Sequence, residues 1–348
     1  MKKRCYGIDI ARLLSMFMVV LLHNLNQGGA LDWEVSSNRA LVYLTLENYS
    51  IVAVNVFSLI SGYLSVGHAV KSARMFDLWF SAFFWSVFTS LIGIATGAEF
   101  GSWFVSCLFP VCNVKYWYLD AFLAMQLFLP FINGGIERLG KRRVSQLAIC
   151  LVAVCSLLGF AGGLGITGGY STLWLLVLWV VGAAIRLNAD VAKKMISTKR
   201  LVLGIAAIPL LSTVMEWYSS VAGLSVDRWI YYVSPLVVIQ AICLFLLCLR
   251  IDVRSEGVRR LLGTLSPAAF GVYLIDNSTW FYQMWLANRF AWVSNIRILK
   301  GIPFVLLVSV AMFVCFLTLE FLRLQVQERL KQSMLKLGGE RKSPKSIK

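Results

Sequence analysis

The chain has 348 residues, of which 59% are apolar and only 14% are charged. A soluble domain usually carries about 25% charged residues, so this composition excludes an ordinary soluble protein and favours one with most of its surface in lipid. The formal charge of +16 would suit a nucleic-acid partner in amount, but its distribution along the chain excludes that class of partner.

Ten apolar segments follow one another, each with about the length that a helix needs to cross the hydrocarbon core of a bilayer. Only helices satisfy every backbone group within a single span. We therefore expect an all-α integral membrane protein, with residues 1–322 as the transmembrane domain. Residues 323–348 are expected to form a basic tail with a short helix on the membrane surface. The expected spans are 8–25, 50–67, 76–96, 116–134, 146–163, 170–187, 201–217, 229–249, 262–285 and 302–322.

The Lys and Arg residues predict the orientation of the chain. With the N-terminus in the cytosol, 26 of the 33 fall in cytoplasmic segments, six fall outside, and Arg12 lies within the first span. Cytoplasmic segments of membrane proteins carry such an excess, so both termini are predicted to be cytoplasmic, and the positive charge is a topology signal. The six outer residues are Arg39, Lys115, Arg228, Arg289, Arg297 and Lys300.

The cysteines and one glycine motif predict neither a metal site nor a dinucleotide site. Most of the eight cysteines lie in or beside apolar runs, while Cys107 and Cys112 lie in an expected outer segment, where an oxidising compartment would allow a disulfide. The glycines at 163, 165 and 168 match a dinucleotide-type spacing. No strand precedes them and their loop is expected outside, so we interpret them as a turn.

Ionisable residues within a span are costly, and they are therefore candidates for function. Arg12 and His23 are eleven residues apart in the first span, which places them on one helix face, about 20° apart in rotation and ~16 Å apart along the axis. Asp9 is one turn before Arg12 and is expected to pair with it. The alternative of equal weight is structural: Arg12 extends to the cytoplasmic surface, and His23 is a hydrogen-bonded interface residue.

Five blocks in chain order resemble the membrane acyltransferase family 3, whose members carry an Arg, ten residues and a His in the first span. The second block ends in Ser-Gly-Tyr, the third is a basic-x-x-Arg loop, and the last usually continues into His. The blocks are Gly7–His23, Val54–Leu64, Lys71–Arg74, Tyr116–Asn133 and Ser266–Ile275. The resemblance implies a polysaccharide O-acetyltransferase type of enzyme that uses acyl-CoA, with acetyl-CoA as the expected donor.

The resemblance also implies roles for residues on the donor side. Arg12, Lys71 and Arg74 would hold the phosphates of the cytosolic donor. His23 would act as the general base, a task for which an imidazole is suited near neutral pH. Ser61 and Tyr63 would line the donor channel, although close packing of the small residues at Ser61 and the following glycine is the favoured alternative for Ser61.

On the acceptor side the candidates are Glu47, Trp117, Tyr118 and Asp276. Glu47 would contact the acceptor or orient His23. Trp117 and Tyr118 would anchor a span in the aromatic belt or stack on a sugar. Asp276 stands where the family commonly has His, and two interpretations stay open: a proton-accepting or sugar-orienting residue, or a polar residue that faces water.

These observations predict a membrane-bound O-acyltransferase of the bacterial cytoplasmic membrane. It would transfer an acetyl-like group to a hydroxyl of a cell-surface polysaccharide or its lipid-linked precursor. The alternative is a secondary transporter or flippase of glycan intermediates, with His23 and Asp276 as a proton relay. Transporters typically show paired halves, and this sequence shows no internal symmetry. A scaffold protein, the third class, would tolerate replacement of Arg12 and His23.

Overall fold

The computed structural model of the chain describes residues 4–31, 37–69, 71–99, 101, 103–111, 116–162 and 166–340, and every regular element within these ranges is a helix. The longer helices are α1 (Tyr6–Leu25), α2 (Asn38–Ser50), α3 (Ala53–Ser65), α4 (Ser72–Ala95), α6 (Trp117–Phe160), α7 (Thr172–Leu187), α9 (Thr198–Val221), α10 (Pro235–Cys248) and α13 (Ile298–Glu340). The shorter ones are α5 (Trp103–Leu108), α8 (Ala189–Met195), α11 (Glu256–Leu265), α12 (Ala269–Asp276), the π-helix η4 (Thr279–Trp285) and the 3₁₀ turns η1 (Thr167–Gly169), η2 (Asp227–Trp229), η3 (Ser266–Ala268) and η5 (Ala291–Asn295).

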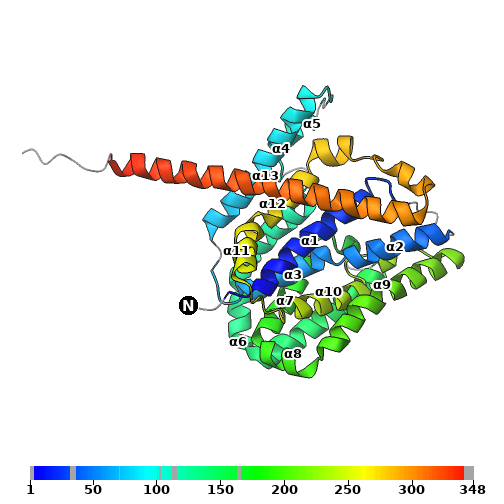
Figure 1. Ribbon diagram of the computed structural model, residues 1–348. Helices are drawn as coiled ribbons and strands as arrows, with labels where there is room; N and C mark the ends of the chain where they lie inside the picture. Colours follow the sequence, from blue (N-terminus) through cyan, green and yellow to red (C-terminus); the bar gives the residue numbers. More distant parts are fainter. Residues whose placement is uncertain are drawn as a thin grey trace, which may run out of the picture.

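Helix α1 runs through the middle of the bundle, where it contacts α2, α3, α10, α11, α12 and α13 (Figure 1). Its start lies directly on α10, because a Cβ added at Gly7 would lie 1.9 Å from the carbonyl oxygen of Cys248. Just beyond its end, the segment 288–290 donates backbone hydrogen bonds of 2.9 and 2.7 Å to the carbonyls of Gln27 and Gly28. Both ends of α1 are therefore fixed by backbone contacts.

Six of the described helices are long and apolar enough to cross a membrane, and the bent pair α7–α8 makes a seventh if it is one span. The chain is therefore a multi-pass membrane protein. The total of ten spans stays a prediction. One of the six spans joins α2 to α3 over Arg39–Ser65, so the expected span 50–67 starts too late. Helix α2 begins where the Ser37 hydroxyl accepts a hydrogen bond from the backbone N–H of Ala40, a capping signal that the apolar count does not register.

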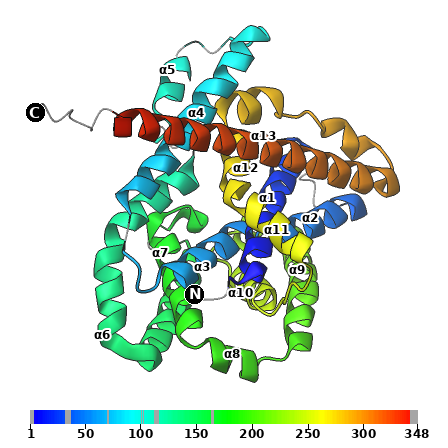
Figure 2. The same cartoon turned by 60° about the vertical axis from the view of Figure 1, so that its left-hand side comes forward.

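Helix α6 is a hairpin of two limbs rather than one rod. Gly140, with φ 72° and ψ 166°, interrupts its helical backbone, and a straight helix of this length would extend ~66 Å. Yet Trp117 at its start stacks on Tyr232, and Ser156 near its end donates a hydrogen bond to the carbonyl of Val233. The fourth and fifth expected spans are thus the two limbs of α6, which turns at the lower left of Figure 2.

Two expected elements differ from the structure near the C-terminus. The segment 262–285 is broken into α11, η3, α12 and η4, with breaks at Pro267 and after Asp276. The separate surface helix expected within 323–348 is wrong, because α13 continues from the membrane span to Glu340. The residues that follow Leu322 are mostly good helix formers, with neither Gly nor Pro before Gly338, so nothing ends the helix at the membrane surface.

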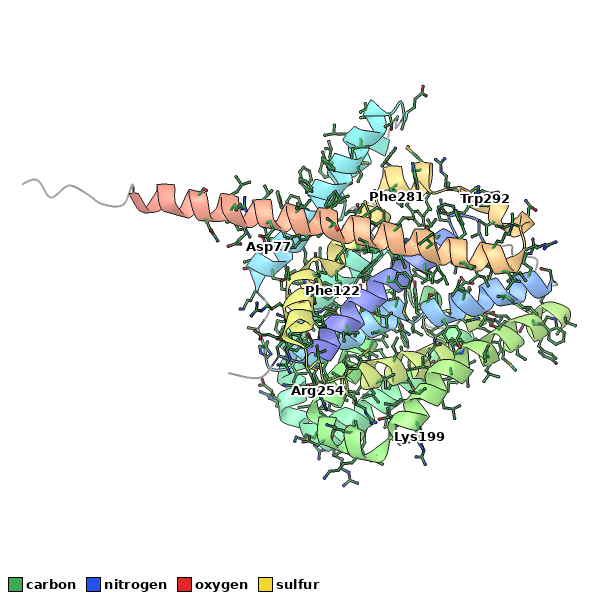
Figure 3. The ribbon with its side chains drawn as sticks, viewed as in Figure 1. Asp77, Phe122, Lys199, Arg254, Phe281 and Trp292 are labelled. Atoms are coloured by element: carbon green, nitrogen blue, oxygen red, sulfur yellow. The ribbon has the colours of Figure 1, made fainter. Side chains whose placement is uncertain are left out.

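The bundle has two distinguishable ends. The start of α1 and the C-terminal end of α13 lie toward the left of Figure 1, where Figure 3 also places Asp77 and Arg254, while Trp292 lies at the opposite end. Arg12 lies in the half of α1 nearer the N-terminus, and His23 lies in its last turn. Any site built on α1 therefore reaches from one end of the bundle toward the other. Which end faces the cytosol stays a prediction.

Candidate active site

Helix α1 carries the two ionisable residues that the sequence singles out. It is unbroken from Tyr6 to Leu25, so the eleven-residue spacing of Arg12 and His23 corresponds to ~16 Å along one face. The two side chains are partly exposed, and each meets a different set of residues near its own end of the helix. The site therefore has two parts joined by a rigid element.

The His23 part is a partly buried contact of the ion-pair type between α1 and α12. The Nδ1 atom of His23 lies 2.6 Å from Oδ2 of Asp276, and the side chains are 20% and 0% exposed. Asp276 is the last residue of α12, where the chain breaks before η4. The water-facing interpretation of Asp276 is therefore wrong: the break in the expected ninth span turns this carboxylate inward, onto the imidazole.

Tyr282 of η4 completes the surroundings of the imidazole. Its ring meets the ring of His23 edge to face, with the centroids 4.8 Å apart. Gln27, four residues after His23, donates a 3.1 Å hydrogen bond from Nε2 to the carbonyl of Tyr282. Sequence reasoning did not select Tyr282, because a π-helix after a chain break has no periodic signal.

This geometry determines what the imidazole can do chemically. In a neutral His23, the contact with Asp276 holds the ring proton on Nδ1, so Nε2 carries the free lone pair. A buried carboxylate in this position orients an imidazole and stabilises its protonated form when it accepts a proton. The pair is therefore arranged as a general base, with Nε2 as the accepting atom.

The Arg12 part is a cationic group with one carboxylate at its centre. Arg4 binds Asp9 through two hydrogen bonds, of 2.8 Å from Nε and 3.0 Å from Nη2. Arg12 lies farther from Asp9, at 3.8 Å, so the expected Asp9–Arg12 pair is secondary to one with Arg4. The charges of Arg4 and Arg74 are near enough to Arg12 to repel it. Two guanidinium groups, those of Arg4 and Arg12, thus share a single carboxylate, and the charge of Arg74 lies close to them.

Lys71 and Arg74 lie at the start of α4, and Arg74 is the one of the two whose charge acts on this group. Lys71 is the residue before the first turn of α4, and both side chains are exposed. The structure brings Arg74 into electrostatic range of Arg12, as the expected donor site requires. Arg4, which sequence reasoning counted only as a topology signal, is part of the same cationic group.

Ser61 and Tyr63 lie on α3, where their hydroxyls bond to α3 itself and to α7. The Ser61 hydroxyl donates to the carbonyl of Phe57, 3.1 Å away. The close packing of α3 on α7 falls on the next residue, since a Cβ at Gly62 would lie 2.0 Å from the carbonyl oxygen of Trp179. The Tyr63 hydroxyl accepts a 3.1 Å hydrogen bond from Arg186 and lines a cavity of about 110 Å³ to which α1 contributes no residue.

The acceptor-side candidates differ in burial and in their distance along the chain from His23. Glu47 is buried and accepts a 2.8 Å hydrogen bond from Asn26, three residues after His23. Tyr118 is buried, with its hydroxyl 3.4 Å from that of Ser58, so it packs inside the bundle rather than in an aromatic belt. Trp117 is partly exposed and remains available for an acceptor.

Two sequence features remain outside this site. Cys112 lies outside the described residues, so the Cys107–Cys112 disulfide stays a prediction, and Cys107 itself is buried. No group of three or more His, Cys, Asp or Glu side chains suited to a metal ion occurs in the part of the chain that the structure describes.

A family model described as an acyltransferase domain matches residues 6–320. The chain belongs to acyltransferase family 3. The match spans both parts of the site, including α1 and α12, and it confirms the resemblance carried by the five sequence blocks. In this acyltransferase, the paired imidazole and the cationic group are the elements with evident chemistry. Comparisons of the chain with curated proteins and with solved structures gave no match.

Proposed function

We propose that this acyltransferase transfers an acetyl-like group from cytosolic acyl-CoA, with acetyl-CoA as the expected donor, to a hydroxyl of a cell-surface polysaccharide or its lipid-linked precursor. It would do so in the bacterial cytoplasmic membrane. One observation carries the proposal: helix α1 holds a cationic group around Arg12 and, ~16 Å away along its axis, an imidazole paired with a buried carboxylate at 2.6 Å.

The cationic group suits the polyanionic end of acyl-CoA. Arg12, Arg74 and Lys71, with Arg4 beside them, would bind its phosphates, because guanidinium groups make strong paired hydrogen bonds to phosphate oxygens. The long pantetheine arm of CoA separates these phosphates from the thioester. Phosphates held at the Arg12 end would therefore let the thioester approach His23.

The proposed transfer step involves no change of oxidation state, and the residues described can carry it out. The acceptor hydroxyl oxygen attacks the thioester carbonyl carbon, and Nε2 of His23 takes the hydroxyl proton. A C–O bond forms, the C–S bond breaks, and the thiolate of CoA leaves with the electron pair. The proton on His23 then neutralises that thiolate, so the products are an ester and free CoA, and the imidazole returns to its neutral form.

A buried imidazole–carboxylate pair would also suit proton-coupled transport of a glycan intermediate. Membership in an acyltransferase family favours the transferase. Turnover of radiolabelled acetyl-CoA by the purified protein, supplied with unacylated polysaccharide, separates the two proposals, because a transporter would leave the thioester intact.

Replacement of His23 tests the proposed function. We expect His23→Ala to abolish acylation of surface glycans, measured by mass spectrometry, while the protein still inserts into the membrane. The chain offers a matched control in His68, its only other histidine, which is exposed. His68→Ala should leave acylation intact. Persistent acylation in the His23→Ala variant would show that the proposed base is wrong.

A further inference from the structure

Three aromatic rings meet at the start of α6. The rings of Trp117 and Tyr170 have centroids 4.6 Å apart, those of Trp117 and Tyr232 are 5.7 Å apart, and those of Tyr170 and Tyr232 are 4.9 Å apart. We call these three residues the aromatic group. They come from three segments, the start of α6, the residue after η1, and the turn before α10, so the fold assembles them.

Tyr170 is the exposed member of the aromatic group. Its side chain is 51% exposed, whereas Tyr232 is buried. Part of the Tyr170 side chain therefore packs against the rings of Trp117 and Tyr232, and the rest stays open to the surroundings.

The backbone before Tyr170 holds this ring in place. Gly168 and Gly169 have φ values of 65° and 101°, a region that other residues rarely adopt. A Cβ at Gly169 would lie 2.6 Å from Cβ of Tyr232, so the turn packs directly on the aromatic group. The ring of Tyr170 is thus presented by a close-packed turn and not by a free loop.

The aromatic group lies near the proposed base. Tyr282, whose ring contacts His23 at 4.8 Å, is near enough to interact electrostatically with Tyr170, Tyr232 and Asp276. Tyr282 and His23 are both partly exposed. The structure thus places a partly exposed tyrosine, Tyr282, in contact with His23 and within electrostatic range of the aromatic group.

We propose that the ring of Tyr170, backed by Trp117, is the stacking platform for a pyranose ring of the acceptor glycan. This inference rests on the proposed function and deepens it. A pyranose ring has an apolar face of C–H groups and an edge of hydroxyls, and a rigid aromatic ring supplies a matching apolar surface at low entropic cost. Stacking on Tyr170 would hold the sugar while its neighbour in the glycan, or the same ring, presents a hydroxyl to His23.

The test compares three variants in membranes, with labelled acetyl-CoA as donor and, as acceptor, surface polysaccharide purified from a strain that lacks this gene. Tyr170→Ala should raise the apparent KM for the polysaccharide about tenfold, which corresponds to the ~1.4 kcal/mol of one aromatic contact. The KM for acetyl-CoA should not change. Tyr170→Phe, which keeps the ring, should retain the wild-type KM.

Tyr218→Ala is the matched control, because Tyr218 is 58% exposed on α9, outside the aromatic group. It should leave every constant unchanged. An acceptor KM within twofold of wild type in Tyr170→Ala would overturn the proposal and leave Tyr170 as a membrane-interface anchor. A wild-type enzyme that never cleaves acetyl-CoA would instead overturn the proposed function, so the two failures are distinguishable.

Discussion

The imidazole of His23 is held by a carboxylate that water does not reach. Asp276 is completely buried, and its Oδ2 lies 2.6 Å from Nδ1 of His23. In such surroundings a hydrogen bond to a charged group is stronger than in water. The contact therefore fixes both the direction of the ring and the nitrogen that is left free to accept a proton.

Replacement of Asp276 by Asn tests this role. The variant keeps the shape of the side chain but loses the charge that holds the proton on Nδ1, so kcat should fall by about 10³-fold or more, as when the carboxylate of a catalytic triad is replaced. The KM for acetyl-CoA should stay unchanged. Asp252→Asn, an exposed change in the segment before α11, is the control and should have no effect. A wild-type kcat in Asp276→Asn would mean that the carboxylate does not assist His23.

Arg74 provides the test of the donor side. It is exposed, and its charge acts on Arg12, so Arg74→Glu places a negative charge where the proposed phosphates bind. We expect the apparent KM for acetyl-CoA to rise at least tenfold while kcat changes little. High salt should also raise the apparent KM of the wild-type enzyme for acetyl-CoA, because it screens exposed charges. Arg142→Glu, an exposed change on α6, is the control; an equal rise there would show a general charge effect.

Residues within one helix were predictable from the sequence, and partners across the chain were not. The shared face of Arg12 and His23 follows from helical periodicity alone, and the unbroken α1 confirms it. Asp276 is 253 residues from His23, and no local pattern links two residues so far apart. For this reason the sequence alone does not decide whether Asp276 faces water or belongs to the site, and it gives no signal for Tyr282.

At the scale of the helices, α12 is held by a contact that has almost no spare room. A Cβ at Gly271 would lie 2.1 Å from Cγ of Glu320 on α13. Glu320 cannot move aside easily, since it accepts hydrogen bonds of 2.6 Å from Trp85 of α4 and 2.7 Å from Arg323. Helices α4, α12 and α13 are therefore joined at one point, five residues before Asp276.

Gly271→Ala should loosen this junction and displace α12. We expect destabilisation of about 1–3 kcal/mol, as for other overpacked sites, measured by thermal unfolding in detergent, together with a lower kcat because Asp276 moves. Gly257→Ala on α11 is the control, because only Ser255 Oγ, at 3.9 Å, lies near the added carbon. An unchanged melting temperature in Gly271→Ala would contradict this prediction, because Glu320 would then move aside without loss of stability.

The ion pair within the junction allows a second comparison. Arg323 and Glu320 are almost fully buried, whereas the pair Arg260–Glu256 is exposed. Arg323→Met leaves a buried carboxylate without its partner and should destabilise the protein by about 3–5 kcal/mol. Arg260→Met should cost less than about 1 kcal/mol. Equal melting temperatures for the two variants would contradict the difference in burial on which this prediction depends.

The differences between expected and observed helices have identifiable causes. An apolar count finds lipid-facing segments, and it located both limbs of α6 on either side of Gly140. It missed α2, whose 13 residues include polar side chains such as Glu47 that are buried against other helices. The same count ended the last span at Leu322, where apolar character falls but helix propensity does not.

At the scale of the whole molecule, the charge distribution is the property most easily tested. With 26 of the 33 Lys and Arg residues assigned to cytoplasmic segments, the positive-inside rule requires both termini in the cytosol. A reporter that is active only in the cytosol should work when fused after Lys348. The same reporter inserted at Gly223, in the turn after α9, should be inactive, and activity at both sites would contradict the topology.

The anchoring of α1 at both ends has a consequence for the donor. Backbone contacts at Gly7 and at Gln27–Gly28 hold both ends of the helix in place. In the proposed reaction, the distance between the phosphate-binding residues and His23 would therefore be set by the helix, and it would select for the length of the acyl carrier. A thioester with a shorter arm would reach either the phosphate-binding residues or His23, but not both at once. Donor specificity would then depend mainly on the length of the carrier and less on the acyl group that it carries.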